Sequence, residues 1–374
     1  MGEEADVLVI GAGPGGLAVA GALAMRGRGA TVLERADDVA ESWRHHYERL
    51  HLHTPRRLSG LPGMPIPREF GRWVARDDVV RYLERYRDHH GIDVHTGIDV
   101  ARIDRAPRGW TVRATDGREF SARHIVVATG HNHTPVLPAW PGQESFPGAV
   151  VHAADYRNPR PYAARSVLVV GTGNTGCEIA QDLADGGASA VWLAYRSLPH
   201  IVRRTTFGWP AQATGIAVRH LPTRVVDRIA RVTARVEVPD LTAYGLPRPA
   251  TGLFTRVKEG AIPVQDVGIV AAIEARRVVP VPTIERFDGA EVVLVDGRRL
   301  RPDVVLVAAG YRNGLGPLVG HLGVLGSRGN PVVTGGHEPP GAPGLWFTGY
   351  TNPISGMFRE LRVDAKRIAK AVAG

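Results

Sequence analysis

Residues 6–16 read DVLVIGAGPGG, and this stretch decides the fold. Its first half is a short apolar run rich in β-branched residues, which predicts a buried parallel strand. Its second half fits the pattern G-x-G-x-x-G at Gly11, Gly13 and Gly16. In this pattern the first glycine makes a tight turn, the second lets backbone amides approach a pyrophosphate, and the third lets a helix pack on the strand. The stretch therefore predicts a strand–turn–helix unit that binds a dinucleotide at the helix N-terminus.

The end of the next predicted strand indicates which nucleotide this first turn binds. The strand at residues 30–33 is followed by Glu34. A carboxylate in this position accepts hydrogen bonds from ribose hydroxyls, as the adenosine half of FAD or NAD requires.

The same unit occurs a second time, where residues 166–176 read SVLVVGTGNTG. The candidate nucleotide ligands in this second turn are Gly171, Gly173, Asn174, Thr175 and Gly176. The strand that follows ends with Arg196 in place of an acid. A carboxylate would repel a 2′-phosphate, whereas an arginine would pair with it. We therefore expect FAD at the first site and NADPH at the second.

A second repeat supports the first. Residues 110–130 and 291–310 each contain alternating polar and apolar residues, an Asp-Gly turn, and an apolar strand that ends in small residues. Proline-rich linkers lie at residues 158–162 and 279–283. We therefore predict an α/β protein with two Rossmann-like dinucleotide-binding domains.

The expected domain boundaries follow from these linkers. An FAD-binding domain spans residues 1–150 and 281–374. An NADPH-binding domain at residues 157–280 is inserted into it, so that the FAD-binding domain is discontinuous in sequence.

The composition is that of an ordinary globular chain. Of its 374 residues, 44% are hydrophobic and 22% are charged, which excludes wholesale disorder. A single cysteine excludes a disulfide framework, a dithiol redox centre and a cysteine-rich zinc site. The net charge is +9, but the arginines are scattered and no nucleic-acid-binding motif is present, so we expect no nucleic-acid partner. With no signal peptide or membrane-spanning run, we expect a cytoplasmic protein without membrane contact; its oligomeric state is left open.

A further motif lies between the two nucleotide turns. Phe146, Gly148, His152 and Tyr156 fit F-x-G-x-x-x-H-x-x-x-Y. This resembles the signature of the flavin-containing monooxygenases, and the resemblance covers nearly the whole chain. It is greatest to the YUCCA-type branch, which is matched further at residues 50–52, 61–65, 128–130, 303–311 and 345–350.

The resemblance implies an enzyme in which NADPH reduces FAD, the reduced flavin and O₂ form a C4a-(hydro)peroxide, and one oxygen passes to a small organic substrate. In the YUCCA-type branch that substrate is a 2-oxo acid, which is oxidatively decarboxylated; the wider family oxygenates nitrogen or sulfur. The resemblance further implies that these residues lie along the cofactors: Arg35, Trp43, Arg44, Leu50, Thr129, Gly130, Gly310, Tyr311 and Gly349. Because the cofactors carry the chemistry, the candidate catalytic side chains are His152 and Tyr156 alone, and we expect His152 to help fix the domain geometry around NADP.

Two other functions stay open: a reductase that passes electrons to a partner, and a Baeyer–Villiger oxygenation of a ketone or imine. The lone Cys177 lies in the second predicted helix, where we expect a small buried residue without a redox role.

Two further patterns attract attention. Four histidines lie close together in sequence, but no carboxylate accompanies them at ligand spacing, so we expect no metal site at His45, His46, His51 and His53. Residues 224–238 place apolar residues and arginines at helical spacing. That helix either exposes a solvated arginine face, lies on an anionic membrane or covers the substrate entrance.

Overall fold

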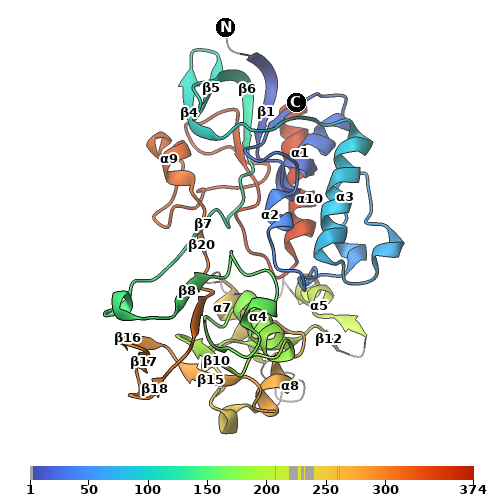
Figure 1. The fold of residues 1–374 in the computed structure, drawn as a ribbon. Coiled ribbons are helices and arrows are strands. Elements are labelled where there is room, and N and C mark those ends of the chain that lie inside the picture. The colour runs from blue at the N-terminus through green and yellow to red at the C-terminus, as the bar shows by residue number, and fades with distance from the viewer. Residues whose placement is uncertain are drawn as a thin grey trace. The chain divides into compact units, whose positions relative to one another are not determined.

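The computed structural model describes residues 3–206, 208–218, 226–228, 231, 240–258, 260 and 262–374. They form two compact units (Figure 1). The first unit comprises Met1–His45, Leu50–Thr134 and Tyr311–Gly374, and the second comprises His46–Arg49 and Pro135–Gly310. Each unit contains a sheet with parallel strands and packed helices, which confirms the expected α/β fold class.

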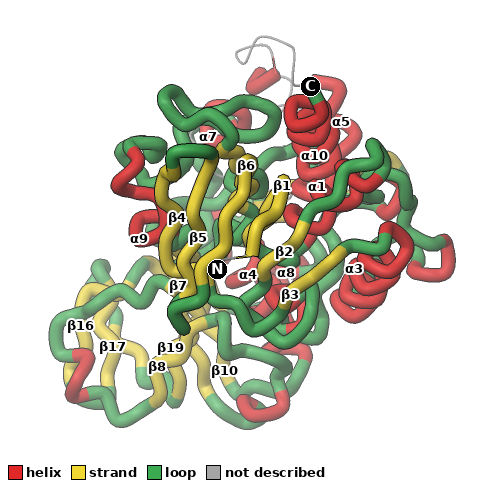
Figure 2. The backbone as a smooth tube through the Cα atoms, turned by 90° about the horizontal axis from the view of Figure 1, so that it is seen from above, coloured by secondary structure: helices red, strands yellow, loops and turns green. Residues whose placement is uncertain are grey.

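The first unit is built on a seven-stranded sheet with the order β3-β2-β1-β6-β5-β4, in which β21 also pairs with β6 (Figure 2). Its strands are β1 (Glu3–Ile10), β2 (Thr31–Leu33), β3 (Asp93–His95), β4 (Val100–Ala106), β5 (Gly109–Ala114), β6 (Glu119–Val127) and β21 (Leu345–Phe347). Pairing is parallel along β3-β2-β1-β6 and between β6 and β21, and antiparallel along β4-β5-β6. Val7, Leu8, Val9 and Ile10 are all buried, as the apolar run of β1 predicts.

Helices cover both faces of this sheet. Val7 and Val9 share one core with α1 (Pro14–Ala24), α3 (Arg76–His90) and α10 (Met357–Ala373). Leu8 and Ile10 point to the other core, which includes α9 (Leu315–Val319). The short helices of this unit are α2 (Glu41–Arg44), η1 (Arg56–Leu58), η2 (Arg68–Phe70) and η6 (Gly320–Leu322).

The second unit is built on a five-stranded parallel sheet with the order β15-β10-β9-β19-β8. Its strands are β8 (Ala149–His152), β9 (Ser166–Val170), β10 (Ala190–Tyr195), β15 (Val279–Pro282) and β19 (Val304–Val307). An antiparallel sheet of β16 (Ile284–Asp288), β17 (Glu291–Leu294) and β18 (Arg299–Leu300) leads into β19. Residues of β16, β17 and β19 share one core.

The remaining elements of the second unit surround its sheet. The helices are α4 (Asn174–Asp185), α5 (Ala211–Val218), α7 (Leu253–Lys258), α8 (Ile269–Glu274), η3 (Gln143–Ser145), η4 (Arg160–Tyr162) and η5 (Thr242–Tyr244). The paired short strands are β11 (Ile201–Arg203) with β14 (Val264–Asp266), and β12 (Thr205–Thr206) with β13 (Trp209–Pro210). Where the chain passes between the units, β7 (Thr134–Pro135) pairs with β20 (Tyr311–Arg312).

The predicted repeats correspond to the two units. In the first unit β6 pairs with β1, and in the second β19 pairs with β9 in the same parallel manner. Residues 135–150 and 281–310 therefore pack with the second unit, whereas the expected boundaries place them with the first. The apolar strand β19 is buried along its length and could join either sheet by its pattern alone.

Within the described residues, no helix is long and apolar enough to cross a membrane. The predicted basic helix at residues 224–238 lies outside the described residues except at 226–228 and 231.

Candidate functional site

The first glycine turn connects β1 to α1, and two of its glycines are required by packing. Gly11 has φ +104°, and a Cβ there would lie 2.8 Å from the carbonyl oxygen of Ala128. A Cβ at Gly16 would overlap the carbonyl oxygen of Gly11. Gly13 differs, because a Cβ there would meet no protein atom within 4 Å. The turn thus keeps an open space at Gly13, the N-cap of α1, which is the position expected to face a pyrophosphate.

The second glycine turn, between β9 and α4, repeats this arrangement. Gly171 has φ +116° and its added Cβ would lie 2.5 Å from the carbonyl oxygen of Ala308, while a Cβ at Gly176 would overlap the carbonyl oxygen of Gly171. Gly173, the N-cap of α4, again faces open space. Two turns with the same pattern of packed and open glycines provide two places for a dinucleotide.

Glu34 is buried directly behind the first turn. One carboxylate oxygen accepts a hydrogen bond from the Ala12 backbone at 2.6 Å, and the other accepts one from the Ala36 backbone at 3.0 Å. The carboxylate therefore fixes the turn, and its remaining lone pairs can accept ribose hydroxyls. Arg35 is exposed and its guanidinium lies 3.1 Å from the His133 ring.

Three of the residues expected along the flavin are held by protein contacts. Trp43 is partly buried and packs edge-on against Phe358 at 5.8 Å. Arg44 pairs with Asp38 and Glu84, which ties the segment after β2 to α3. The Leu50 side chain is buried. These contacts give Trp43, Arg44 and Leu50 structural roles in the first unit.

The carboxyl ends of β6 and β21 bring together residues that lie far apart in sequence. The Thr129 backbone donates a hydrogen bond to the Tyr350 hydroxyl at 3.2 Å, and the two hydroxyls are 2.8 Å apart. A ring nitrogen of His131 lies 3.3 Å from the Gly349 carbonyl oxygen. Burial lowers the pKa of His131, so this ring is neutral near pH 7. Sequence reasoning had not singled out His131 and Tyr350, although they flank the expected residues Gly130 and Gly349.

The second turn has its own arrangement of the expected ligands. Both ends of the Asn174 amide are engaged, with the nitrogen donating to the Pro263 carbonyl at 3.3 Å and the oxygen accepting from the Gln265 backbone at 2.8 Å. Its side chain therefore attaches the β14 segment to α4. Thr175 is half-buried in the first turn of α4, and Arg196 is exposed beyond the end of β10.

The four residues of the F-x-G-x-x-x-H-x-x-x-Y signature all make contacts within the second unit. Phe146 packs against Phe287 at 5.1 Å, and a Cβ at Gly148 would lie 2.6 Å from the carbonyl oxygen of Asp303. One ring nitrogen of His152 accepts from the Ala154 backbone at 3.0 Å, and the other lies 3.2 Å from the Gly310 carbonyl oxygen. The fourth residue, Tyr156, is described next.

Tyr156 is completely buried and donates to an Asp182 carboxylate oxygen at 2.7 Å. Burial and this hydrogen bond raise the pKa of Tyr156. Tyr47 lies beside it, with ring centroids 6.3 Å apart, and donates to Glu178 at 2.9 Å. His152 and Tyr156 are therefore held in place by protein contacts, and a role for them at the cofactor stays a prediction.

Cys177 is buried in α4 and carries a free thiol, as expected. Burial raises the pKa of this thiol to about 12, which leaves it in the unreactive protonated form near pH 7.

Of the histidines at positions 45, 46, 51 and 53, His45 lies 3.0 Å from Glu41 of the preceding helix α2, and His51 forms an isolated bridge to Ala75. Tyr311 lies in β20, and Gly310 has φ +86°.

Known proteins share both the sequence and the fold of this chain. Residues 8–205 match the family described as pyridine nucleotide-disulphide oxidoreductase. Indole-3-pyruvate monooxygenase YUCCA1 from Oryza sativa subsp. japonica is 35% identical over 350 residues, which span 92% of this chain and 86% of that protein. A flavin-containing monooxygenase from Stenotrophomonas maltophilia has a TM-score of 0.74 and 26% identity, covering 100% of both chains. Cyclohexanone monooxygenase from Rhodococcus sp. Phi1 bound to NADP⁺ shares the fold, with a TM-score of 0.74 at 18% identity over 100% of this chain and 85% of that chain.

These likenesses and the two dinucleotide turns define an enzyme class, the flavin-dependent monooxygenases that use FAD, NADPH and O₂ on a small molecule. Within that class the chain belongs to the flavin-containing monooxygenase family, in its YUCCA-like branch. The signature at residues 146–156 and the repeated glycine turns predicted this membership.

Proposed function

We propose that this enzyme inserts one atom of O₂ into a 2-oxo acid with loss of CO₂. The observation that carries the proposal is the 35% identity, over 92% of the chain, to an indole-3-pyruvate monooxygenase. The balanced reaction takes R–CO–COOH, O₂, NADPH and a proton to R–COOH, CO₂, water and NADP⁺. The C–C bond beside the ketone breaks, the substrate carbon is oxidised, and the second oxygen atom leaves as water.

We assign FAD to the first glycine turn and NADPH to the second. When bound, the flavin takes hydride from NADPH and delivers one oxygen atom from O₂. The open space at Gly13 and the carboxylate of Glu34 suit the pyrophosphate and the ribose of FAD. Gly173 offers the same space to the second nucleotide, and exposed Arg196 suits a 2′-phosphate.

The chain's own residues support this chemistry by binding and positioning. Tyr350 and Thr129 hold together the ends of β6 and β21 in the unit that we assign to FAD. His152 and Tyr156 hold the β8 edge of the unit that we assign to NADPH. The proposal therefore requires no protein acid or base to react with the substrate.

A panel of substrates under ¹⁸O₂ tests the proposal. The FAD-loaded enzyme with NADPH is offered indole-3-pyruvate, phenylpyruvate, a tertiary amine, a thioether and a cyclic ketone. We expect the 2-oxo acids to release CO₂ and to give acids one carbon shorter that carry one ¹⁸O atom. Preferential gain of one ¹⁸O by the amine or thioether would assign N- or S-oxygenation instead, and a lactone would assign a Baeyer–Villiger reaction. NADPH oxidation with no ¹⁸O in any organic product would favour a reductase.

A further inference from the structure

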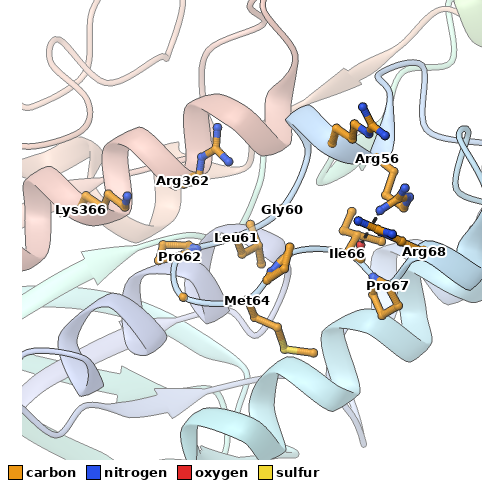
Figure 3. A pocket seen from close by; sticks show the side chains of 13 residues that line it. Arg56, Gly60, Leu61, Pro62, Met64, Ile66, Pro67, Arg68, Arg362 and Lys366 are labelled. Carbon is orange, nitrogen blue, oxygen red and sulfur yellow. Dashed lines mark hydrogen bonds between the residues drawn. The ribbon is translucent and has the colours of Figure 1, made fainter.

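A pocket of about 600 Å³ in the first unit is lined by none of the residues expected at either nucleotide. One wall is α10, which contributes Arg362 and Lys366, and the other is the segment from η1 to η2 (Figure 3). That segment contains the loop Leu61-Pro62-Gly63-Met64-Pro65. The monooxygenase reaction proposed above makes no use of this pocket.

The pocket is lined by five cationic side chains and, among its thirteen described lining residues, by no carboxylate. The five are Arg56, Arg57, Arg68, Arg362 and Lys366. Within the described part of the chain, Arg57, Arg68, Arg362 and Lys366 form no ion pair. Elsewhere a number of arginines pair with a neighbouring carboxylate, as Arg44 does with Asp38 and Arg113 with Asp104, whereas these four pocket side chains do not.

The loop at residues 61–65, which lines the pocket, is held in place by hydrogen bonds to α3. The Tyr82 hydroxyl accepts from the Leu61 backbone at 2.8 Å and donates to the Met64 carbonyl at 2.6 Å, and the Tyr86 hydroxyl donates to the Pro62 carbonyl at 2.7 Å. The Arg56 guanidinium donates to the Ile66 carbonyl at 3.1 Å. Prolines restrict the backbone further. A preorganised pocket loses little entropy on binding, which favours a true ligand site.

Volume and charge together define the ligand. A concave pocket of this size matches a small molecule rather than a flat membrane surface. Arg57, Arg68 and Arg362 carry planar donor pairs that suit phosphate oxygens, and a single monoanion would leave most of the positive charge uncompensated. We propose that this pocket binds a small soluble polyanion that carries two or more linked phosphate groups, such as a polyphosphate or a nucleoside polyphosphate.

Calorimetric titration of inorganic tripolyphosphate into the FAD-loaded enzyme saturated with NADP⁺ tests the proposal. Occupied nucleotide sites cannot then account for the binding. We expect a dissociation constant below about 1 mM at low salt, weakening as ionic strength rises. Lys366→Gln should weaken binding about three- to tenfold. Lys370→Gln is the matched control, because Lys370 is exposed on the same helix but does not line the pocket.

Four outcomes would overturn the proposal: no binding tighter than that of sulfate, equal weakening by Lys366→Gln and Lys370→Gln, no salt dependence, or displacement of NADP⁺ by tripolyphosphate.

Sedimentation with vesicles containing a phosphorylated inositol lipid tests the source of the phosphates. We expect no co-sedimentation. Co-sedimentation that Lys366→Gln abolishes would assign the pocket to a lipid headgroup and overturn a soluble ligand. The variants should retain bound FAD and the wild-type circular dichroism spectrum, which shows that their effect is on the pocket.

Discussion

Gly13 and Gly173 are the positions at which a substitution is expected to block nucleotide binding without disturbing the fold. Both have ordinary negative φ angles, and a Cβ at either would meet no protein atom within 4 Å. Alanine at these positions is therefore compatible with the folded chain. A methyl group would nevertheless occupy the space that a pyrophosphate needs. The two positions thus allow each nucleotide to be removed without unfolding its unit.

We expect Gly13→Ala to be purified folded but largely without flavin, whereas Gly173→Ala keeps its flavin and needs a much higher NADPH concentration for reduction. Flavin absorbance after gel filtration and the NADPH dependence of flavin reduction measure the two effects. Gly16→Ala is the control for misfolding, because its Cβ would overlap the Gly11 carbonyl oxygen. Flavin loss in Gly173→Ala with full flavin in Gly13→Ala would reverse our assignment of the two sites.

At the scale of the element, the signature at residues 146–156 stabilises strand β8. His152 is neutral there, because one ring nitrogen accepts from the Ala154 backbone while the other donates to the Gly310 carbonyl. Burial lowers the pKa of His152 from its ordinary value of 6.5. The unfolded chain therefore takes up this proton first as pH falls. The stabilising contribution of His152 is present above pH 6.5 and is lost as pH falls below it.

His152→Asn tests this contribution, because an Asn amide oxygen can still accept from the Ala154 backbone but does not titrate. We expect the thermal midpoint of the variant at pH 8 to lie below that of the wild type, in line with the loss of one hydrogen bond worth about 1 kcal/mol. Between pH 7 and pH 5 the variant's midpoint should fall less than that of the wild type. Parallel pH profiles would show that His152 does not titrate in this way, and the other histidines with lowered pKa are common to both proteins.

Local sequence predicted the elements well and their partners less well. The glycine turns, the strands before them and both hairpin repeats are visible in residue type and spacing, because these patterns reflect short-range constraints. The partner of β19 is not visible, since a VVLV strand buried along its length suits either sheet. Tyr47 shows the same limit: it packs in the second unit through Glu178, 131 positions away, and nothing in its own neighbourhood indicates this.

Of the candidate site, the sequence predicted the two glycine turns, but not the contacts that the neighbouring side chains make with the rest of the protein. Arg44, which we expect along the flavin, also pairs with Glu84 of α3. Asn174, which we expect in the second nucleotide site, also holds the β14 segment through its amide. The partners Glu84, Pro263 and Gln265 lie 40 or more positions away in sequence, so these contacts depend on the assembled fold. His131 and Tyr350 were missed for the same reason.

At the scale of the whole molecule, the fold does not separate an oxygenase from a thiol reductase, because the matching family is described as pyridine nucleotide-disulphide oxidoreductase. The number of cysteines does separate them. Reduction of a disulfide by a protein dithiol needs two thiols, and this chain has one, which is buried in α4. Burial also raises the pKa of that thiol to about 12, so it is a poor nucleophile near pH 7.

We therefore expect Cys177→Ala to keep the wild-type rate of NADPH oxidation within about twofold. Its stability should fall only by the small packing cost of losing one buried sulfur atom, on the order of 1 kcal/mol. Alanine is the informative replacement, because serine would bury a hydroxyl that needs a partner. Stopped-flow measurement of flavin reduction, followed by O₂ consumption, checks both halves of the cycle. A folded, flavin-loaded Cys177→Ala that is reduced by NADPH but no longer turns over would place the thiol in the reaction. Since the flavin would still be reduced normally, that result would require electrons to leave the reduced flavin through a thiol, as in a reductase and not in a monooxygenase.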